Sequence, residues 1–402
     1  MRVIFLTHYF PPEVGAPQAR IAALARGLSA RGLTVTVHTC PPHYPDGVVR
    51  LPYRNRLVQR ESVGHVRVVR SLVYPALNRG FTRRLANHTS FAASALATAP
   101  AAGRADVVVA ESPPLFLAAA AIGYARMKRA ALVVNVADRW PLSAVELGAL
   151  DNASAIRAAE WLERRIYRAA ARVTVPTRGL ADSIAELPSG DGKVRWLPPS
   201  VDVTRFTALG PRAGEGPLEV LYAGTVGLAQ GVETLVEAAA LLGPERVRLT
   251  IAGDGAAAPQ VAAAAAGLSN VRSLGTVAHE EIPALYAAAD VAVVPLRDRP
   301  LFAAALPTKL LEGLAAARPV VLSARGEAAD LIRGAKAGLV VPPENAKELA
   351  AAFELLRRDP AMRARLGAAG RALAERQFGR DDAIERWEGV LREAVAVRGL
   401  RT

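Results

Sequence analysis

One pattern recurs along most of the sequence: a short apolar run, a turn, and then a longer stretch whose apolar side chains have helical spacing. Near the N-terminus, the apolar runs Arg2–Thr7 and Leu33–Thr39 flank a predicted helix at Ala19–Arg31. Short apolar runs are typical of strands buried on both faces, and a helix between two such runs indicates that the strands are parallel. Connections of this kind are right-handed in nearly all proteins. The pattern therefore predicts an α/β fold in which helices cover parallel sheets.

The alternation stops between Pro198 and Pro217 and starts again with the run Leu218–Ala223. Proline and glycine are frequent in this stretch and apolar periodicity is lost, which indicates a linker. A chain of 402 residues is long enough for two domains of ordinary size. We therefore predict an N-terminal domain at 1–198, a linker at 199–217 and a C-terminal domain at 218–376. A last helix within 377–402 is expected to pack back on the N-terminal domain.

Two stretches of the N-terminal half depart from the pattern. The arginine-rich stretch Pro41–Leu77 is expected to be irregular, with a strand signal at His65–Val69. The stretch Asp138–Gly148 is expected to be a loop after a strand. Loops that follow the strands of a parallel sheet are the usual place for ligands.

Positive charge is concentrated in the first half of the chain. Residues 1–200 hold 26 Lys and Arg against 13 Asp and Glu, a net charge of +13, while residues 201–402 hold 24 of each sign. Between Arg50 and Arg84 there are nine arginines and one acid, Glu61. Such a segment favours an anionic membrane surface or a phosphate-bearing substrate, and the alternative is a solubilising surface. The neutral second half argues against a nucleic-acid partner.

Cysteine content and hydropathy indicate the compartment. The single cysteine, Cys40, excludes an internal disulfide framework and favours a reducing environment. No apolar run reaches the roughly 18–20 residues of a membrane span, and the first six residues are too short for a signal peptide. We therefore expect a cytoplasmic protein, which is peripheral at the inner membrane face if the arginine-rich segment binds lipid.

The stretch Pro300–Val321 gives the clearest indication of a ligand site. After a turn at 306–308, it opens a helix that is expected to begin at Lys309. The free N–H groups and the positive dipole end of a helix start favour a phosphate, and Lys309 adds a full positive charge. Glu312, one turn further on, is placed to bind two neighbouring hydroxyls of a ribose. These features indicate a nucleoside diphosphate, and the alternative is an ordinary amphipathic helix with one exposed glutamate.

Glycine-rich turns follow strands in both halves. In the second half the turn is AGTVGLAQG, and the strand after it ends at Gly253. Glycine lets a phosphate approach the backbone closely, and the alternative is a tight strand–helix turn. In the first half, Gly15 precedes the first helix, but its surroundings lack the spacing of a dinucleotide-binding loop. The candidate residues in the second-half turn are Gly224, Thr225, Gly227 and Gln230.

The N-terminal half also holds candidates for binding an acceptor. Asp138, Arg139 and Trp140 follow a predicted strand, so that an acid, a base and an aromatic ring are expected to converge there. A carboxylate at this point would position an acceptor hydroxyl, and Trp140 would stack on a sugar. The alternative is a structural aspartate at a strand end. Weaker candidates of the same kind are His8, His43 and Glu111.

The order of these pieces resembles that of retaining glycosyltransferases of the GT-B fold, glycosyltransferase family 4. Within this family, the sequence is similar to the bacterial subgroup that transfers N-acetylated amino or deoxy-amino sugars. The resemblance covers nearly the whole chain. It rests on LTHYFPPEVGAPQAR, PPHYPDG, ADVVVAESPP, the DRWP loop, AGTVGLAQGVETL, IAGDG, ADVAVVPL, PTKLLEGLAAARPVV and GLVVPPENAKELA.

The resemblance implies two Rossmann-like domains that face each other across a cleft, and a nucleotide-diphosphate sugar, most often a UDP-sugar, held mainly by the second domain. Glu312 would hold the ribose, and Gly15 would approach the diphosphate. The candidate catalytic residues are Lys309, which would stabilise the leaving diphosphate, and Asp138 from the loop described above. The implied acceptor is a lipid-linked glycan or phosphate, or a secondary metabolite. No catalytic metal and no cofactor are implied. Backbone contacts to the sugar and diphosphate would come from Ala305, Leu306, Pro307 and Thr308.

The sequence departs from the family pattern at three places. The common glutamate eight residues before Glu312 is Ala304, and the basic pair usual near the glycine turn is replaced by Thr225 and Gln230. The histidine that many members carry after a first-domain strand is absent near Asp138. Lys309 would supply part of the missing positive charge, with Arg297 or Arg299 as reserves.

Two other functions remain open from sequence. The first is another enzyme on the same fold, such as a UDP-sugar 2-epimerase, although that chemistry needs more acids and bases around the sugar than the sequence offers. The second is a non-catalytic nucleotide-sugar-binding protein.

Overall fold

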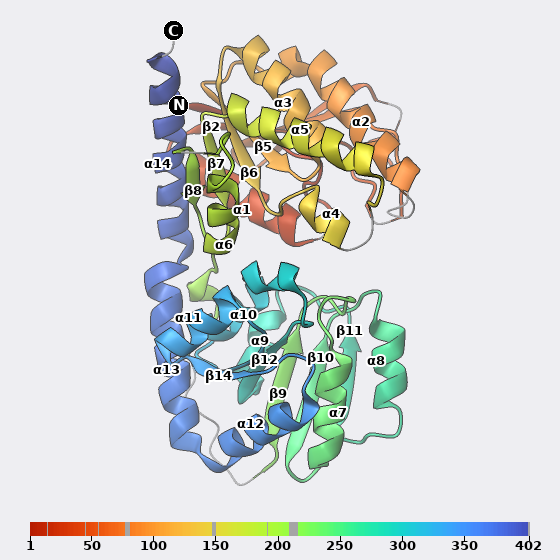
Figure 1. Cartoon of the computed structure of the whole chain (residues 1–402), viewed down its shortest axis with the longest axis vertical. Coiled ribbons are helices and arrows are strands. Elements are labelled where there is room, and N and C mark those ends of the chain that lie inside the picture. The colour runs from red at the N-terminus through yellow and green to blue at the C-terminus, as the bar shows by residue number, and fades with distance from the viewer. Residues whose placement is uncertain are drawn as a thin grey trace. The chain divides into compact units, whose positions relative to one another are not determined.

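The computed structural model describes residues 1–13, 15–44, 46–54, 56–76, 81–146, 150–190, 192–208 and 216–400. They form two compact units, one of Met1–Leu197 with Ile384–Thr402 and one of Pro198–Ala383 (Figure 1). Residues 209–215 of the predicted linker lie outside the described part. Both units are α/β layers with parallel sheets flanked by helices, as the alternating sequence pattern predicts.

The sheet of the N-terminal unit has the order β3-β4-β2-β1-β5-β6-β7-β8. All neighbouring strands are parallel except β3 and β4, which form an antiparallel hairpin. Its strands are β1 (Arg2–Leu6), β2 (Thr34–Thr39), β3 (Val58–Val63), β4 (Val66–Ser71), β5 (Val107–Ser112), β6 (Ala131–Val136), β7 (Arg172–Val175) and β8 (Val194–Trp196).

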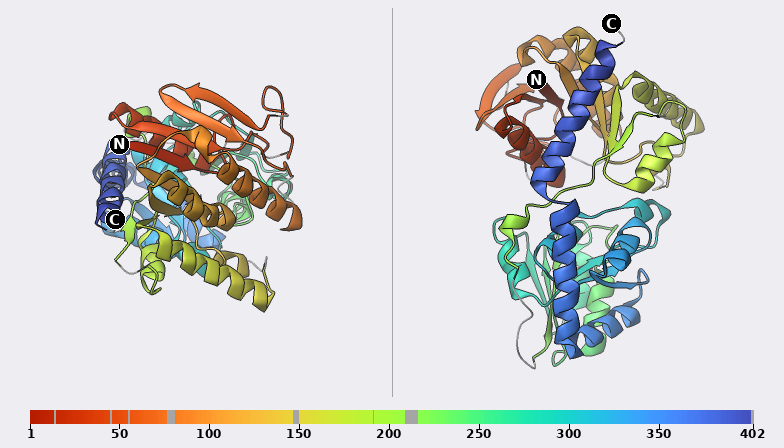
Figure 2. Two further views of the ribbon diagram at one scale, coloured as in Figure 1. Left: turned by 90° about the horizontal axis from the view of Figure 1, so that it is seen from above. Right: turned by 90° about the vertical axis from the view of Figure 1, so that its left-hand side faces the viewer.

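Helices cover both faces of this sheet. Side chains from α2, α3, α5 and α6 form one apolar core with the sheet, and side chains from α1 and α14 form the other. Figure 2 shows the C-terminal part of α14 beside the first strand and helix, where Trp387 and Leu391 share a core with Ile21 and Leu28. The helices are α1 (Ala16–Ala30), α2 (Phe81–Ala97), η1 (Ala99–Ala102), α3 (Leu115–Lys128), α4 (Leu142–Glu146), α5 (Ala153–Ala169), α6 (Arg178–Ala185) and α14 (Arg380–Gly399).

Two predictions for this unit are wrong. The stretch Pro41–Leu77 contains a second strand, β3, in addition to the expected one. Its sequence VQRESV has no apolar alternation because β3 is a half-exposed edge strand that is fixed by backbone pairing to β4. The stretch Asp138–Gly148 is not all loop, because α4 occupies Leu142–Glu146, while Gly148 lies outside the described residues.

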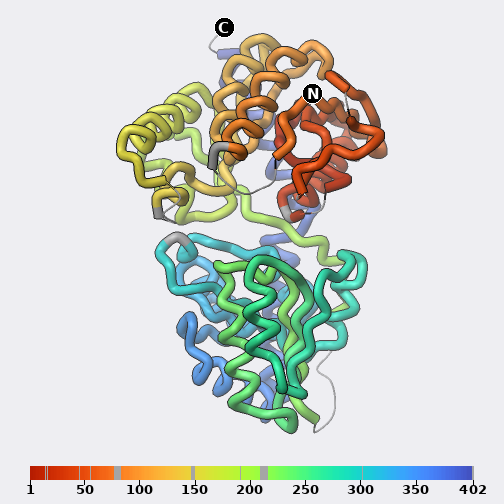
Figure 3. The backbone as a smooth tube through the Cα atoms, turned by 90° about the vertical axis from the view of Figure 1, so that its right-hand side faces the viewer, coloured from red at the N-terminus to blue at the C-terminus, as the bar shows by residue number. Residues whose placement is uncertain are grey.

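The C-terminal unit has a fully parallel sheet in the order β11-β10-β9-β12-β13-β14. Figure 3 traces the chain of this unit through its repeated strand–helix crossovers. Its strands are β9 (Leu218–Ala223), β10 (Val247–Ala252), β11 (Val271–Gly275), β12 (Val291–Pro295), β13 (Val320–Ser323) and β14 (Gly338–Val341).

Two helical layers enclose this sheet as well. Helices α9, α10, α11 and α13 pack on one face, and α7, α8 and α12 pack on the other. The helices are η2 (Val203–Arg205), α7 (Glu233–Leu242), α8 (Ala258–Ala265), α9 (Ile282–Ala288), η3 (Pro300–Ala304), α10 (Thr308–Ala315), α11 (Glu327–Ala335), α12 (Ala346–Arg358) and α13 (Pro360–Gln377). Among the helices of the described residues, none combines the length and apolar character needed to cross a bilayer.

The strand order sets the position of the candidate site in this unit. Strand β9 lies between β10 and β12, so the chain leaves the carboxyl end of β9 in one direction and that of β12 in the other. A parallel sheet binds ligands at such a switch point. The glycine turn after β9, the turn after β10 and the segment leading to α10 therefore lie at one edge of one sheet.

Candidate functional site

The two glycine turns of the C-terminal unit touch each other. Gly224 and Gly253 have φ values of 142° and 148°, which favour glycine. A Cβ on Gly253 would lie 1.8 Å from the carbonyl oxygen of Gly224, so the two backbones meet where a side chain has no room. Gln230 stabilises the first turn, because its Oε1 accepts a hydrogen bond from the Gly227 N–H at 3.1 Å. Glycine at these positions is thus required by packing, whatever the turn binds.

Helix α10 begins at Thr308, one residue earlier than predicted, and Pro307 is its N-cap residue. No side chain caps this helix start, so N–H groups of its first turn are left without an intrahelical partner. Ala305 and Leu306 pack against the apolar core, which fixes the segment before the helix. The backbone at Ala305–Thr308 can therefore offer hydrogen-bond donors from a rigid position.

Lys309 folds back over the glycine turn instead of pointing along α10. Its Nζ donates to the Tyr222 hydroxyl at 2.6 Å, and that hydroxyl in turn donates to the Thr225 carbonyl oxygen. A Cβ on Gly224 would lie 3.1 Å from Nζ. Burial lowers the pKa of Lys309 to about 8, and Glu312 opposes this shift. The structure thus places the ammonium of Lys309 against the Gly224 turn, which contains no basic residue of its own.

Glu312 lies one turn after Lys309 and is half-buried. Burial raises the pKa of Glu312 to about 7, while the positive charges of Arg205 and Lys309 act to lower this pKa. The Arg205 guanidinium donates a hydrogen bond to the backbone oxygen of His279 at 2.9 Å, and this bond holds Arg205 in place. Sequence reasoning missed Arg205 and Tyr222, because the first lies in the predicted linker and the second in an apolar strand.

Arg297, which the sequence suggests as a further source of positive charge for the site, is already paired with acidic side chains. Its guanidinium forms ion pairs with Glu344 at 2.7 Å and with Glu233, and it donates to the Leu228 carbonyl oxygen at 2.7 Å. These bonds fasten the glycine turn to the segment after β12. Arg297 therefore supports the turn, and Lys309 is the cation placed directly against it.

In the N-terminal unit, the predicted histidines are buried in a hydrogen-bonded cluster. Asn87 joins them: its Oδ1 lies 2.8 Å from His8 Nε2, and its Nδ2 lies 2.9 Å from His43 Nε2. His43 Nδ1 lies 2.9 Å from the Pro41 carbonyl oxygen. Candidate ligand atoms of His8, Cys40 and His43 lie within 4.8 Å of one another, but hydrogen bonds already occupy three of the four imidazole nitrogens. The cluster is thus a rigid, polar part of the core.

Glu111 at the end of β5 is bound within the fold. Its carboxylate accepts from Arg20 on α1 at 2.5 Å and from Asn135 on β6 at 3.0 Å, and Asn135 accepts from Thr174. Gly15, immediately before α1, is extended, and a Cβ there would lie 2.4 Å from the movable Oε1 of Gln18. Glu111 therefore holds α1 against the sheet and is not a free acceptor ligand.

Of the three residues expected to converge after β6, Arg139 and Trp140 are engaged within the N-terminal unit. Arg139 turns toward α5 and α6, where it contacts Glu163 at 3.3 Å and donates to the Ser183 hydroxyl at 2.7 Å. Trp140 packs against the apolar core of the sheet. Asp138 remains half-buried after β6.

Comparisons with known proteins agree with this architecture. Residues 15–200 match the family model described as a glycosyl transferase 4-like domain, and residues 217–359 match the model of glycosyl transferases group 1. The chain is 32% identical over 252 residues to an alpha-D-kanosaminyltransferase of Streptomyces kanamyceticus, which covers 58% of this chain and 64% of that protein. It is 25% identical over 341 residues to the putative colanic acid biosynthesis glycosyl transferase WcaI of Escherichia coli K12, covering 81% and 83%.

Solved structures share the fold over almost the full chain. The sucrose-phosphate synthase of Thermosynechococcus elongatus superposes with a TM-score of 0.78 at 19% identity, covering 98% of this chain and 99% of the other. Anabaena HepE in complex with UDP and glucose gives a TM-score of 0.69 at 17% identity, covering 98% and 99%. The chain matches two glycosyltransferase family models, one after the other along the sequence, and it folds into two α/β units with mainly parallel strands. These findings identify the chain as a member of the GT-B glycosyltransferases.

Proposed function

We propose that this protein is a retaining glycosyltransferase that moves a sugar, of the N-acetylamino or deoxy-sugar class, from a UDP-sugar to a lipid-linked glycan or phosphate or to a secondary metabolite. The observation that carries the proposal is the arrangement on α10: Lys309 lies against the Gly224 turn, and Glu312 lies one helical turn further on. The relatives named for kanosaminyl transfer and for colanic acid biosynthesis support a sugar substrate, and the HepE complex supports UDP.

The proposed roles follow from charge. Cleavage of the donor builds negative charge on the leaving diphosphate, which Lys309 and the free N–H groups at the start of α10 stabilise. Glu312 accepts hydrogen bonds from the two ribose hydroxyls. Gly224, Thr225, Gly227, Gln230 and Gly253 form the turns of the C-terminal unit that border the donor. Attack on the face that the diphosphate leaves retains the anomeric configuration, and Asp138 positions the acceptor hydroxyl.

The ribose role of Glu312 is tested by UDP binding. The substitution Glu312→Gln keeps the shape of the side chain but removes the charge, so UDP affinity is expected to fall by about tenfold to a hundredfold. Titration calorimetry with UDP measures the effect. Glu348→Gln on α12, an exposed carboxylate of the same unit, serves as the matched control. Equal UDP affinity in Glu312→Gln and wild type would show that the nucleotide binds elsewhere.

Incubation with a UDP-sugar separates transfer from the other functions. With UDP-N-acetylglucosamine alone, the enzyme is expected to release UDP slowly by hydrolysis and to leave the configuration at C2 unchanged. An acceptor should accelerate UDP release, and the product should keep the donor's anomeric configuration by NMR. Appearance of the 2-epimer in the absence of an acceptor would contradict the proposal, as would UDP binding without turnover of any kind.

The arginine-rich segment leads us to propose contact with an anionic membrane. Arg50, Arg54, Arg56, Arg60, Arg67, Arg83 and Arg84 are exposed, whereas Arg70 is buried and paired with Glu61, and Arg79 lies outside the described residues. Leu51 and Leu57, in the same segment, are 83% and 73% exposed. Exposed apolar side chains among arginines are typical of a surface that enters a headgroup layer.

Vesicle sedimentation tests this contact. The protein is expected to bind vesicles rich in phosphatidylglycerol and to release them at high salt. The double substitution Arg54→Glu/Arg56→Glu should lower the partition coefficient by about tenfold or more, since each basic residue near an anionic surface contributes roughly 1 kcal/mol. Arg104→Glu/Arg126→Glu, a pair of exposed arginines outside the segment, is the control. Equal losses in both variants would point to net charge alone.

A further inference from the structure

A cavity in the C-terminal unit lies at the opposite edge of the sheet from the candidate donor site. It is lined by the turn that leads from α10 into β13, by Asp290 directly before β12, and by one face of α13. Its volume is about 330 Å³, which lies within the roughly 300–1,000 Å³ of small-molecule sites. The cavity is therefore large enough for a ligand of the size of one sugar ring.

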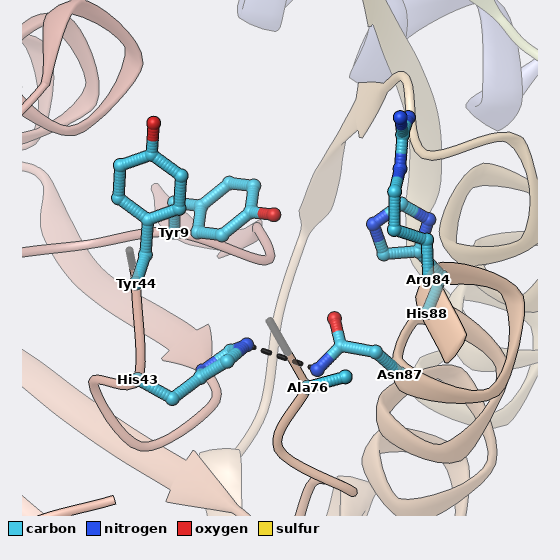
Figure 4. A pocket seen from close by; sticks show the side chains of 7 residues that line it. All are labelled: Tyr9, His43, Tyr44, Ala76, Arg84, Asn87 and His88. Carbon is cyan, nitrogen blue, oxygen red and sulfur yellow. Dashed lines mark hydrogen bonds between the residues drawn. The ribbon is translucent and has the colours of Figure 1, made fainter. Parts of the chain in front are cut away.

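The hollow beside α2 in the N-terminal unit is too small for such a ligand. Figure 4 shows its lining, in which Asn87 Nδ2 lies 2.9 Å from His43 Nε2. With a volume of about 10 Å³, this hollow has room for roughly one water molecule. The cavity on α13 is thus the better candidate for a further binding site.

Three arginines line the cavity on α13, and the fold already uses part of their charge. Arg318 donates to two carbonyl oxygens in the last turn of α9, at 3.0 and 3.1 Å, and Arg363 donates to two in the last turn of α12, at 2.6 and 3.2 Å. Arg371 is paired with Glu375 at 2.6 Å. The carboxyl end of a helix carries about half a negative charge. Two helix ends and the Asp290 carboxylate therefore nearly balance Arg318 and Arg363.

Two buried polar atoms at the cavity have no hydrogen-bond partner within the part of the chain that the structure describes. Asp290 is 7% exposed, and its Oδ2 accepts from the Glu219 N–H at 3.0 Å, whereas its Oδ1 is bare. Arg363 is 5% exposed, and its Nε is bare as well. Nearly all buried polar groups are hydrogen-bonded, because an unpaired one costs free energy. The cavity thus offers one acceptor and one donor to a ligand.

The two bare atoms select the chemistry of the ligand. An anion would be repelled by the Asp290 carboxylate, and a cation would be repelled by the Arg363 guanidinium. A hydroxyl group donates to a carboxylate and accepts from a guanidinium, and a sugar ring carries several hydroxyls side by side. Small methyl groups on the cavity lining leave room for the ring and offer an apolar surface to its C–H groups. The alanines that supply them are Ala208, Ala317, Ala364, Ala368 and Ala372.

We propose that this cavity binds one hexose unit of a neutral saccharide, with Asp290 accepting from one hydroxyl and Arg363 donating to another. The site goes beyond the proposed function, because it lies before the amino ends of β12 and β13, whereas the candidate donor site follows the carboxyl ends of the strands. Helix α10 connects the two edges. It begins at Thr308 beside the donor site, and the carbonyl oxygen of its last residue, Ala315, accepts from Arg371 at 2.5 Å.

NMR of the full chain with isotope-labelled alanine methyl groups tests the proposal. The probe is methyl glucoside, with inorganic phosphate and glycine as charged and zwitterionic counterparts. Methyl glucoside is expected to shift the methyl signals of Ala364 and Ala372, and the other two probes are expected to leave them in place. Ala368→Phe fills the cavity from an exposed position on α13 and should abolish the shifts. Ala361→Phe, at an exposed position of α13 outside the cavity, is the matched control and should keep them.

A substitution at Asp290 tests the proposed hydrogen bond. Asp290→Asn keeps the shape of the side chain and removes its charge, so the affinity for methyl glucoside should fall by about tenfold to a hundredfold. An unchanged affinity in this variant would show that the carboxylate does not bind the sugar. The shifts of the alanine methyl signals, followed through a titration, give the affinity in each variant.

The remaining outcomes separate this inference from the proposed function. No shift in wild type with methyl glucoside would mean that the cavity holds only water, and tighter binding of phosphate or glycine would exclude a saccharide. Equal binding of methyl glucoside in Ala368→Phe and wild type would place the sugar elsewhere. UDP affinity should be unchanged in Ala368→Phe. Failure of the Glu312→Gln test with the expected loss in Ala368→Phe would therefore refute the donor site and leave the saccharide site in place.

Discussion

Replacing Lys309 by methionine is expected to lower kcat for sugar transfer by about 10²–10³-fold. Its ammonium is fixed by Tyr222 beside the Gly224 turn, where the leaving diphosphate would gain negative charge. Methionine keeps most of the side-chain volume and removes the charge. Steady-state kinetics with a UDP-sugar measure the loss. Lys347→Met, an exposed lysine of the same unit, is the matched control and should retain full activity.

The pH profile of the wild type gives a second readout. Glu312 must be ionised to accept from ribose, and its pKa of about 7 means that activity rises as pH increases through this value. Lys309 must be protonated, and its pKa of about 8 means that activity falls above it. A bell-shaped profile between these limits is therefore expected. If Lys309→Met kept the alkaline decline and most of kcat, Lys309 would have no part in the reaction.

Replacing Gly253 by alanine is expected to destabilise the C-terminal unit by roughly 3 kcal/mol. The new Cβ would lie 1.8 Å from the Gly224 carbonyl oxygen, and a backbone atom cannot move aside as a flexible side chain can. The melting temperature of this unit should fall by about 6–12 °C. Circular dichroism monitors the unfolding, and the transition that UDP raises belongs to this unit. UDP affinity should also fall, because the two turns must separate.

Gly267→Ala provides the control for backbone strain alone. Gly267 has a φ of 82°, and a Cβ there would meet no heavy atom within 4 Å. Its replacement should cost about 1 kcal/mol, or about 2–4 °C. If Gly253→Ala and Gly267→Ala had the same small effect, the close contact of the two turns would not matter for stability.

Local sequence predicted most elements because their signals are local. The strands Leu218–Ala223 and Val291–Pro295 are apolar on both faces, and they appear at the predicted residues. The edge strand β3 was missed because half-exposed polar residues form it only by pairing with β4. The helix α4 was missed because it is a single short turn inside an expected loop.

The candidate site was less accessible to such reasoning. The charges on α10 follow from the spacing of Lys309 and Glu312 within one helix, so sequence identified both. Tyr222, which binds Lys309, is 87 positions away from it along the sequence. Arg205, whose charge acts on Glu312, is 107 positions away from that residue. The neighbouring sequence does not identify either residue as part of a site, because Tyr222 lies in an apolar strand and Arg205 lies in the predicted linker.

The sequence by itself determined the alternation of strands and helices in both halves of the chain. From this alternation it follows that each half forms a mainly parallel sheet, with the loops that follow its strands at one edge of that sheet. Only the tertiary structure decided what each polar side chain in those loops does. It committed Arg297, Glu111 and Arg139 to ion pairs within the fold, and it placed Lys309 against the glycine turn. The reason is physical: hydrophobic periodicity is a property of neighbouring residues, whereas a charge takes its partner from whichever segment the strand order brings beside it.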